Sequence, residues 1–227
     1  MVSGTCFRGA SSGFPPLRAV GLAGWALVLG LALVSAAFAA EARRYHVDPA
    51  SSRIDVKVGT AGLFRFAGHD HVVRVEVAKG EIVGDAQDLS ASSVSLAFSM
   101  AAVRVVSTEG PVRDIPKIQE KMAGPAVLDA SRFPEAHFRS TRVTGRSLGS
   151  ERFELEITGD LTLHGATRPM SARLLVEVEG RRLVARGRAT LKQTDFGLQP
   201  VSVAGVVKVK DDLGLDVEIV ALAKTAE

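Results

Sequence analysis

The sequence is poor in cysteine, tryptophan and tyrosine, with one residue of each among 227. The single cysteine, Cys6, lies before a long apolar run near the N-terminus. The chain after that run can therefore form no internal disulfide bond, and it has no thiolate for catalysis or for binding a metal ion. An exported protein of this composition would have to fold without oxidation.

Features of catalysis and of nucleic-acid binding are also scarce. No glycine-rich phosphate loop precedes a helical pattern, and no residues supply an evident oxyanion hole for an Asp–His pair. No basic stripe with interleaved aromatic residues is present, which argues against a nucleic acid as partner. We therefore expect a protein that is not an enzyme, requires no cofactor and binds no nucleic acid.

The first 40 residues contain no acidic side chain, and residues 20–40 carry no charge at all. Arg8 and Arg18 precede this apolar run, and Ala37–Ala40 offers the small residues of a cleavage site. The pattern predicts a signal peptide over residues 1–39 and a periplasmic or secreted protein. The run is also about as long as the ~20 residues that span a bilayer, so an uncleaved anchor that associates the protein with a membrane is the alternative.

The remaining chain, residues 40–227, is close to electrically neutral. The predicted signal peptide holds two of the 28 basic residues and none of the 25 acidic ones, so its removal lowers the net positive charge. A chain of this length fits one domain with a substantial core. Pairing of two such domains as a homodimer is compatible with this composition.

Alternation of apolar and polar residues dominates this region. In Ser93–Met100, apolar residues recur at every second position, at Val94, Leu96 and Phe98. The same period of two recurs between turn residues over residues 52–58, 72–83, 153–158, 170–178, 183–191 and 213–222. This period indicates strands with one buried face. Their number and spacing predict an all-β fold, an antiparallel sandwich or a closed barrel of about eight strands.

One segment has a different period. Between Val112 and Ala123, the apolar residues Ile115, Ile118 and Met122 are spaced by three and four positions among charged neighbours. Gly124-Pro125 follows directly. The spacing predicts an amphipathic helix of about three turns, and we expect this short helix to cross over one end of the barrel.

Two of the five histidines are close together in His69-Asp70-His71. In an extended chain, His69 and His71 point to the same side, where they could share Zn²⁺ or Cu²⁺ with His46, His137 or His164. A contact to the head group of a ligand is a second interpretation. A polar loop in which Asp70 bonds its own backbone is a third. Metal binding through His69 and His71 is therefore an alternative function.

Several motifs follow one another in the order of a known family. They are Tyr45-His46-Val47-Asp48-Pro49, Arg113-Asp114, Phe133-Pro134-Glu135-Ala136-His137-Phe138-Arg139-Ser140, Gly159-Asp160-Leu161-Thr162-Leu163-His164-Gly165-Ala166-Thr167-Arg168-Pro169 and Asp195-Phe196-Gly197. Over residues 43–223 the chain resembles the YceI-like family of exported bacterial proteins. The resemblance implies a lipocalin-like antiparallel β-barrel whose long apolar interior holds a polyisoprenoid or another long-chain amphiphile.

The resemblance implies that the ligand-binding residues lie on the apolar strand faces and at one bend of the chain. The candidate ligand-binding residues on the apolar faces are Phe64, Phe66, Leu96, Phe98, Phe138, Phe153, Leu155 and Ile157. His164 and Arg168 flank the bend, where they either contact a ligand head group or hold the turn. Asp195-Phe196-Gly197 is interpreted as a turn with an aromatic plug.

The chain departs from the family pattern at Gln193, where an arginine is frequent, and at Gly68-His69-Asp70-His71. The segment between Asp114 and Phe133 is also longer than expected. With these differences, the sequence still predicts a carrier or buffer for a long-chain isoprenoid or fatty lipid. The metal-binding function is the alternative from a different class.

Overall fold

The computed structural model describes residues 42–61, 70–200, 202–203 and 207–224. Its strands are β1 (Arg43–Val47), β2 (Arg53–Val58), β3 (Thr60–Ala61), β4 (His71–Val75), β5 (Val77–Gly84), β6 (Ser93–Ser99), β7 (Arg104–Thr108), β8 (Glu135–Gly149), β9 (Arg152–Leu163), β10 (Ala166–Glu179), β11 (Arg182–Lys192), β12 (Ser202–Val203), β13 (Val207–Val209) and β14 (Asp212–Ala223). Its helices are α1 (Ile115–Ala123) and the short 3₁₀ turns η2 (Leu89–Ala91), η3 (Val112–Asp114) and η4 (Thr194–Phe196). In these residues, no helix has the length and apolar character needed to cross a bilayer.

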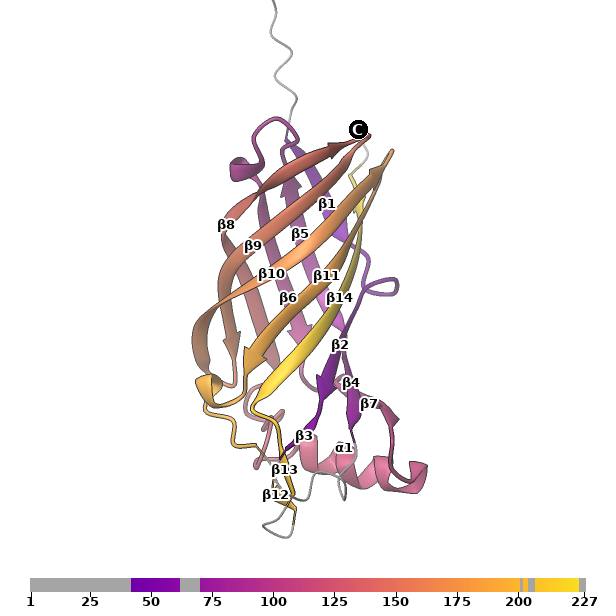
Figure 1. The fold of residues 1–227 in the computed structure, drawn as a ribbon, viewed down its shortest axis with the longest axis vertical. Coiled ribbons are helices and arrows are strands. Elements are labelled where there is room, and N and C mark those ends of the chain that lie inside the picture. The colour runs from indigo at the N-terminus through magenta and orange to yellow at the C-terminus, as the bar shows by residue number, and fades with distance from the viewer. Residues whose placement is uncertain (1–41, 62–69, 201, 204–206, 225–227) are drawn as a thin grey trace, which may run out of the picture. The chain divides into compact units, whose positions relative to one another are not determined.

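Eight of the described strands close into an antiparallel barrel in the order β1-β5-β6-β8-β9-β10-β11-β14 (Figure 1). Strands β1 and β14 close the ring, with Tyr45 opposite Ala223 and Val47 opposite Ala221. Strands β2, β4 and β7 continue the sheet beyond β14. The structure therefore confirms the predicted lipocalin-like β-barrel, and it excludes the antiparallel sandwich.

The barrel wall is interrupted where β1 gives way to β2. Both strands run along β14, and the turn at residues 48–52 separates them. Pro49 has no N–H for a sheet, and the Asp48 carboxylate accepts bonds from the Ser51 hydroxyl at 2.6 Å and the Ala50 N–H at 3.1 Å. The bond from Ser51 lowers the pKa of Asp48. Beyond this turn the sheet continues as β2-β4-β7 instead of closing.

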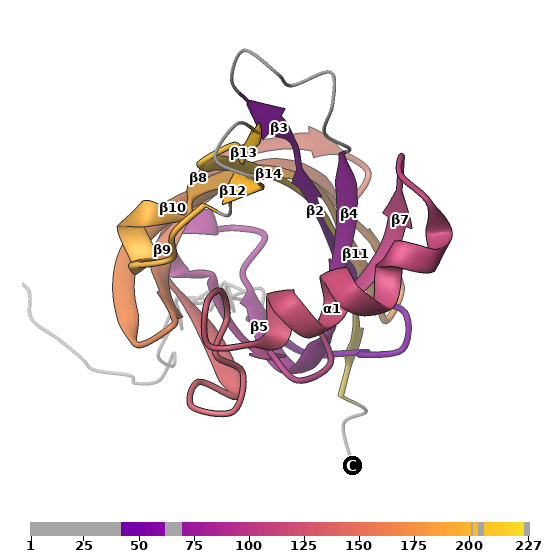
Figure 2. The same cartoon turned by 90° about the horizontal axis from the view of Figure 1, so that it is seen from below.

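Helix α1 lies across the end of the barrel beside β7 (Figure 2). Gln119 on this helix takes the place of a neighbouring strand. Its Nε2 donates to the Val103 carbonyl at 2.6 Å, and its Oε1 accepts from the Val105 N–H at 2.9 Å. Ile118 and Met122 face the barrel interior. The helix predicted to cross over one barrel end is thereby confirmed.

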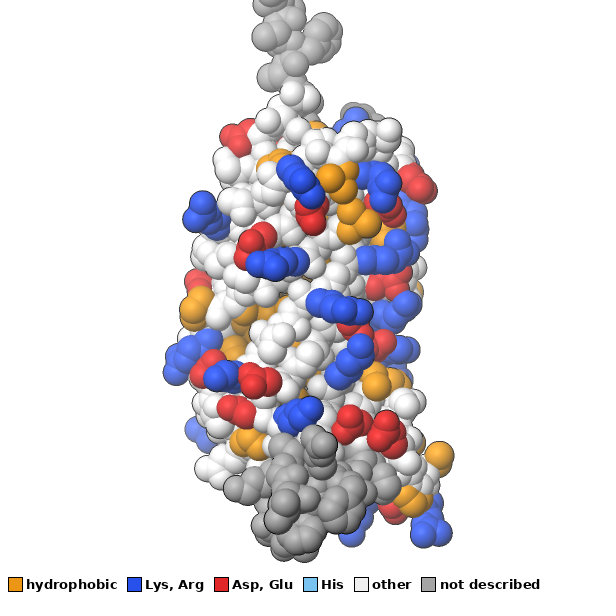
Figure 3. All heavy atoms as spheres, in the orientation of Figure 1, with side chains coloured by type: hydrophobic (Ala, Val, Ile, Leu, Met, Phe, Trp, Pro, Cys, Tyr) orange, Lys and Arg blue, Asp and Glu red, His pale blue; other side chains and the backbone are white. Residues whose placement is uncertain are grey.

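Charged side chains of both signs are interspersed over the side of the barrel that Figure 3 shows. On β14, Asp216 pairs with Lys57 and Arg188 on the two neighbouring strands. Glu218 pairs in the same way with Arg186. Such exposed pairs stabilise a fold by only about 0–1 kcal/mol each. These polar residues alternate with the apolar residues that face inward, and this alternation, more than the ion pairs, fixes the register of the strands.

Candidate ligand-binding cavity

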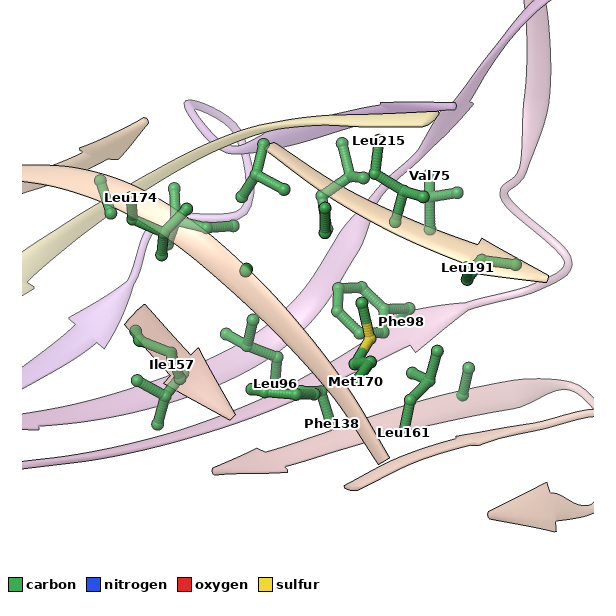
Figure 4. Close-up of a pocket in the computed structure, with 18 of the residues that line it drawn as sticks. Val75, Leu96, Phe98, Phe138, Ile157, Leu161, Met170, Leu174, Leu191 and Leu215 are labelled. Atoms are coloured by element: carbon green, nitrogen blue, oxygen red, sulfur yellow. The ribbon is translucent and has the colours of Figure 1, made fainter. Parts of the chain in front are cut away.

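The barrel encloses an apolar cavity of about 730 Å³. All eight strands of the ring contribute to its lining, together with β2, β4 and α1. Figure 4 shows side chains from opposite walls directed into the same space, with Val75, Leu96, Phe98, Phe138, Ile157, Leu161, Met170, Leu174, Leu191 and Leu215 labelled. The volume lies within the range of about 300–1,000 Å³ that is common for small-molecule sites.

The interior stays open because several inward positions carry small side chains. On β10 and β11, Ala172, Ala185 and Ala189 each contribute a single methyl group to the lining. Ala136 on β8 does the same. Native cores are normally packed without large voids. The apolar strand faces therefore form the wall of a cavity rather than a filled core.

Six of the residues predicted to bind a ligand line this cavity: Leu96, Phe98, Phe138, Phe153, Leu155 and Ile157. Their contact with a ligand stays a prediction. Phe64 and Phe66 lie outside the described residues. Leu161, Met170 and Leu191 also line the cavity, although they were not among the predicted residues. They continue the same alternation along β9, β10 and β11, and this period is the signal that would have found them.

The hairpin end of the cavity is the end beside the β5–β6 and β8–β9 connections. Its polar lining residues are Arg43, Asp85, Gln87, Ser92 and Glu151. Arg43 and Glu151 form an ion pair at 3.3 Å. The Asp85 carboxylate accepts bonds from the N–H groups of Gln87 at 2.8 Å and Asp88 at 2.9 Å. The charged groups at this end are therefore engaged with one another or with backbone.

The helix end of the cavity is the opposite end, beside α1. Its polar lining residues are His71, Lys121 and Gln193. Gln193 is 6% exposed, and its Nε2 donates to the Lys210 carbonyl at 2.8 Å. Its backbone N–H also bonds the Asp211 carbonyl at 3.0 Å. Gln193 thus fixes the connection that follows β11 against the wall of the cavity.

The tripeptide Asp195-Phe196-Gly197 forms the turn with an aromatic plug that the sequence predicted. Asp195 and Phe196 belong to η4, and Gly197 follows with a φ of 72°, which favours glycine. Phe196 is 3% exposed and belongs to the hydrophobic core. The side chain stabilises the fold at this turn.

His164 and Arg168 are not among the residues that line the cavity, and a head-group contact by them stays a prediction. His164 lies in the β9–β10 turn with a φ of 51°, and its ring centroid is 4.5 Å from that of Phe133. The exposed Arg168 guanidinium donates to the carbonyl of Thr167 at 2.8 Å. Both contacts stabilise the bend, as the structural interpretation of this motif predicts.

Of the His69-Asp70-His71 cluster, His69 lies outside the described residues. His71 lines the helix end of the cavity. The Asp70 carboxylate accepts bonds from the N–H of Thr60 at 2.9 Å and from its hydroxyl at 3.3 Å, so it bonds a residue ten positions away rather than its own backbone. Within the described ranges, no group of three or more His, Cys, Asp or Glu side chains could hold a metal ion. Binding of Zn²⁺ or Cu²⁺ through His69 and His71 stays a prediction.

The pentapeptide Gly145-Arg146-Ser147-Leu148-Gly149 has the Gly-x-Ser-x-Gly spacing of a hydrolase nucleophile elbow. That motif needs a sharp turn from a strand into a helix. Here the pentapeptide ends β8 and leads into the hairpin to β9. The Ser147 hydroxyl accepts a bond from the Gly149 N–H at 3.2 Å. This serine therefore shapes a hairpin.

Comparison with known proteins places this barrel in a family. The model of the YceI-like domain matches residues 45–221. A UPF0312 protein of Vibrio cholerae is 31% identical over 210 residues, which cover 89% of this chain and 96% of the relative. Among solved structures, BcnA of Burkholderia cenocepacia superposes with a TM-score of 0.55 at 17% identity, over 77% of this chain and 98% of that one. A polyisoprenoid binding domain from Saccharophagus degradans gives a TM-score of 0.55 at 12% identity, over 81% and 100% of the two chains.

Proposed function

Because the chain belongs to the YceI-like family, we propose that it binds a long-chain apolar molecule, an isoprenoid or a fatty chain, inside the barrel. The apolar cavity of about 730 Å³ is the observation that carries this proposal. The structurally similar domain from Saccharophagus degradans is described as polyisoprenoid binding, which supports the isoprenoid class.

Burial of the chain supplies the binding free energy. Each CH₂ group that leaves water for an apolar site gains about 0.8 kcal/mol, so a chain of fifteen carbons gains about 12 kcal/mol. Association costs about 4–15 kcal/mol in lost translational and rotational freedom. Affinity should therefore rise steeply with chain length until the cavity is full. No bond is formed or broken in this process.

We infer a role as carrier or buffer outside the cytoplasm. The predicted signal peptide over residues 1–39 supports export, and the enclosed site would keep an insoluble chain out of water during transfer between membranes. Such a role needs reversible binding, which burial without a covalent step provides.

The test is native mass spectrometry of the purified exported protein, combined with analysis of an organic extract. We expect an adduct whose mass matches an extractable isoprenoid or fatty lipid, and delipidated protein should take up an added prenyl lipid. The same spectrum reports the oligomeric state and whether residues 1–39 have been removed.

A matched pair of variants links the binding to the cavity. Ala172→Phe places a ring in the cavity lining, whereas Ser171→Phe places the same ring on the exposed outer face. Uptake of the prenyl lipid should fall in Ala172→Phe and persist in Ser171→Phe. Absence of lipid from the extract together with no uptake by the wild type, or equal uptake by both variants, would refute binding in the barrel.

A further inference from the structure

The charged residues that line the cavity differ between its two ends. The hairpin end carries Arg43, Asp85 and Glu151, which leaves one negative charge in excess. The helix end carries Lys121 and, among the described lining residues, no carboxylate. Between the two ends the lining is apolar. The described charged residues of the lining therefore give a net negative charge at the hairpin end and a positive charge at the helix end.

The charges at the hairpin end already have partners. Arg43 is paired with Glu151 at 3.3 Å, and two backbone N–H groups bind the Asp85 carboxylate. An anionic head group placed there would lie beside two carboxylates. An added anion would have to displace Glu151 from Arg43, so this end does not favour a negatively charged ligand.

Lys121 at the helix end is in a different position. None of the described side chains forms an ion pair or a hydrogen bond with its ammonium group. Its neighbours Ile118 and Met122 line the apolar space, so the lysine stands where the apolar lining meets water. The two bonds that Gln119 forms with the backbone of Val103 and Val105 hold this turn of α1 in place. The position of Lys121 at the cavity mouth is thereby set by the fold.

On the basis of the function proposed above, we propose that the ligand is an anionic amphiphile and that Lys121 binds its head. The carboxylate of a fatty acid or the phosphate of a prenyl phosphate lies against Lys121 at the helix end. The chain extends from there toward the hairpin end. Lys121 thus determines both the class of ligand and its direction in the barrel.

This arrangement leaves neither charge buried without a partner. The Lys121 side chain is exposed, so the head group and the ammonium both keep contact with water while the chain is buried. A cation at the mouth of an apolar site therefore adds selectivity at little desolvation cost. A lysine in the last turn of a helix also stabilises that helix by itself, and the experiment must distinguish this effect from ligand binding.

The experiment compares probes that differ only in the head group. Delipidated full-length protein is titrated with palmitate and hexadecanol, and with farnesyl phosphate and farnesol, each by displacement of a fluorescent apolar probe. The variants are Lys121→Gln and, as a matched control, Lys117→Gln on the same helix, a residue that is exposed and does not line the cavity. Thermal melting of each variant reports the effect on the fold.

For one partly exposed charged contact, we expect the wild type to bind an anion about three- to tenfold more tightly than the matching alcohol. Lys121→Gln should remove this preference and leave the affinity for the alcohol unchanged, whereas Lys117→Gln should keep the preference. The pair of probes with the larger ratio identifies the head group as carboxylate or phosphate.

Equal binding of anion and alcohol by the wild type would overturn the role of Lys121 while leaving chain binding intact. A preference reduced equally in both variants would indicate general surface charge and would also overturn it. If Lys121→Gln melts at a lower temperature but still prefers the anion to the alcohol, Lys121 stabilises the helix without binding the head group. This result would also overturn the proposal. Failure of all four probes to bind would refute the proposed function itself.

Discussion

The buried hydroxyl of Ser52 forms hydrogen bonds with both backbone polar groups of Val220. It donates to the carbonyl oxygen at 3.2 Å and accepts from the N–H at 3.0 Å. Ser52 therefore takes the place of a strand residue in the gap between β1 and β2. Without it, β14 would present an unpaired N–H group in the barrel wall, which is costly where water is excluded.

Ser52→Ala should lower the free energy of unfolding by about 1–3 kcal/mol, because the Val220 N–H loses its partner. The Val220 carbonyl keeps the bond from the Asp48 N–H at 2.8 Å. Urea denaturation followed by circular dichroism measures the change. Ser131→Ala, at an exposed position, should change stability by less than ~0.5 kcal/mol. Equal effects of the two substitutions would contradict the role given to Ser52.

Gln119→Leu should loosen α1 from β7. Its amide supplies the bonds to Val103 and Val105, both of which are buried, so the loss should reach about 1–3 kcal/mol. Hydrogen exchange of the Val105 N–H should become faster. Glu120→Gln on the exposed side of the helix is the control. Unchanged protection of Val105 in Gln119→Leu would show that the helix is held by other contacts.

Two strand glycines should respond in opposite ways to alanine. A Cβ at Gly187 would lie 1.9 Å from the Arg173 carbonyl oxygen, whereas one at Gly214 would meet no atom within 4 Å. Gly187→Ala should therefore cost ~3 kcal/mol or more or prevent folding. Gly214→Ala should be neutral or stabilise by about 0.4–1 kcal/mol, because the unfolded chain loses freedom. Thermal melting of both variants gives the comparison, and similar melting temperatures would refute it.

Stability should decrease in acid through Asp211. Its carboxylate accepts bonds from the Thr194 hydroxyl at 2.7 Å and the Thr194 N–H at 2.9 Å, and the hydroxyl bond is the main cause of its lowered pKa. Because the folded state has the lower pKa, this stabilisation is present above the ordinary value of 3.8. It is lost as the pH falls through the folded-state pKa.

Melting temperatures of wild type and Asp211→Asn between pH 7 and pH 2.5 measure this contribution. The two curves should differ at neutral pH and converge in acid. Asp212→Asn makes the same change of charge at the next residue, whose carboxylate accepts no bond from the described part of the chain. A constant difference between wild type and Asp211→Asn at all pH values would exclude the linkage.

The strands and the helix were predictable because their signals are local. Alternation in Ser93–Met100 and the spacing of Ile115, Ile118 and Met122 each reflect which face of one element is buried. The same alternation identified Phe98 and Ile157 as inward-facing. Whether inward-facing residues fill a core or surround a cavity depends on the summed volume of distant strands, and no local pattern contains that sum.

Contacts between distant segments were not predictable. Arg43 and Glu151 form an ion pair at the hairpin end, yet in the sequence Arg43 is an ordinary charged residue at the start of a strand and Glu151 is one in a turn. Gln119 is a polar residue of an amphipathic helix, and nothing nearby indicates that it bonds the backbone of β7. The motif around His164 and Arg168 located a bend correctly but contained no information about which side of the barrel wall these side chains occupy.

The pairing of β1 with β14 also constrains the order of events in folding. Tyr45 and Ala223 come from the first and last strands of the ring, so closure must wait until all the intervening strands have been synthesised. Contacts of such long range are slow to form, and the unpaired edges stay exposed in the meantime. The newly made chain therefore passes through a stage in which the edge strands of the sheet are unpaired. A holding chaperone would protect it from aggregation during this stage.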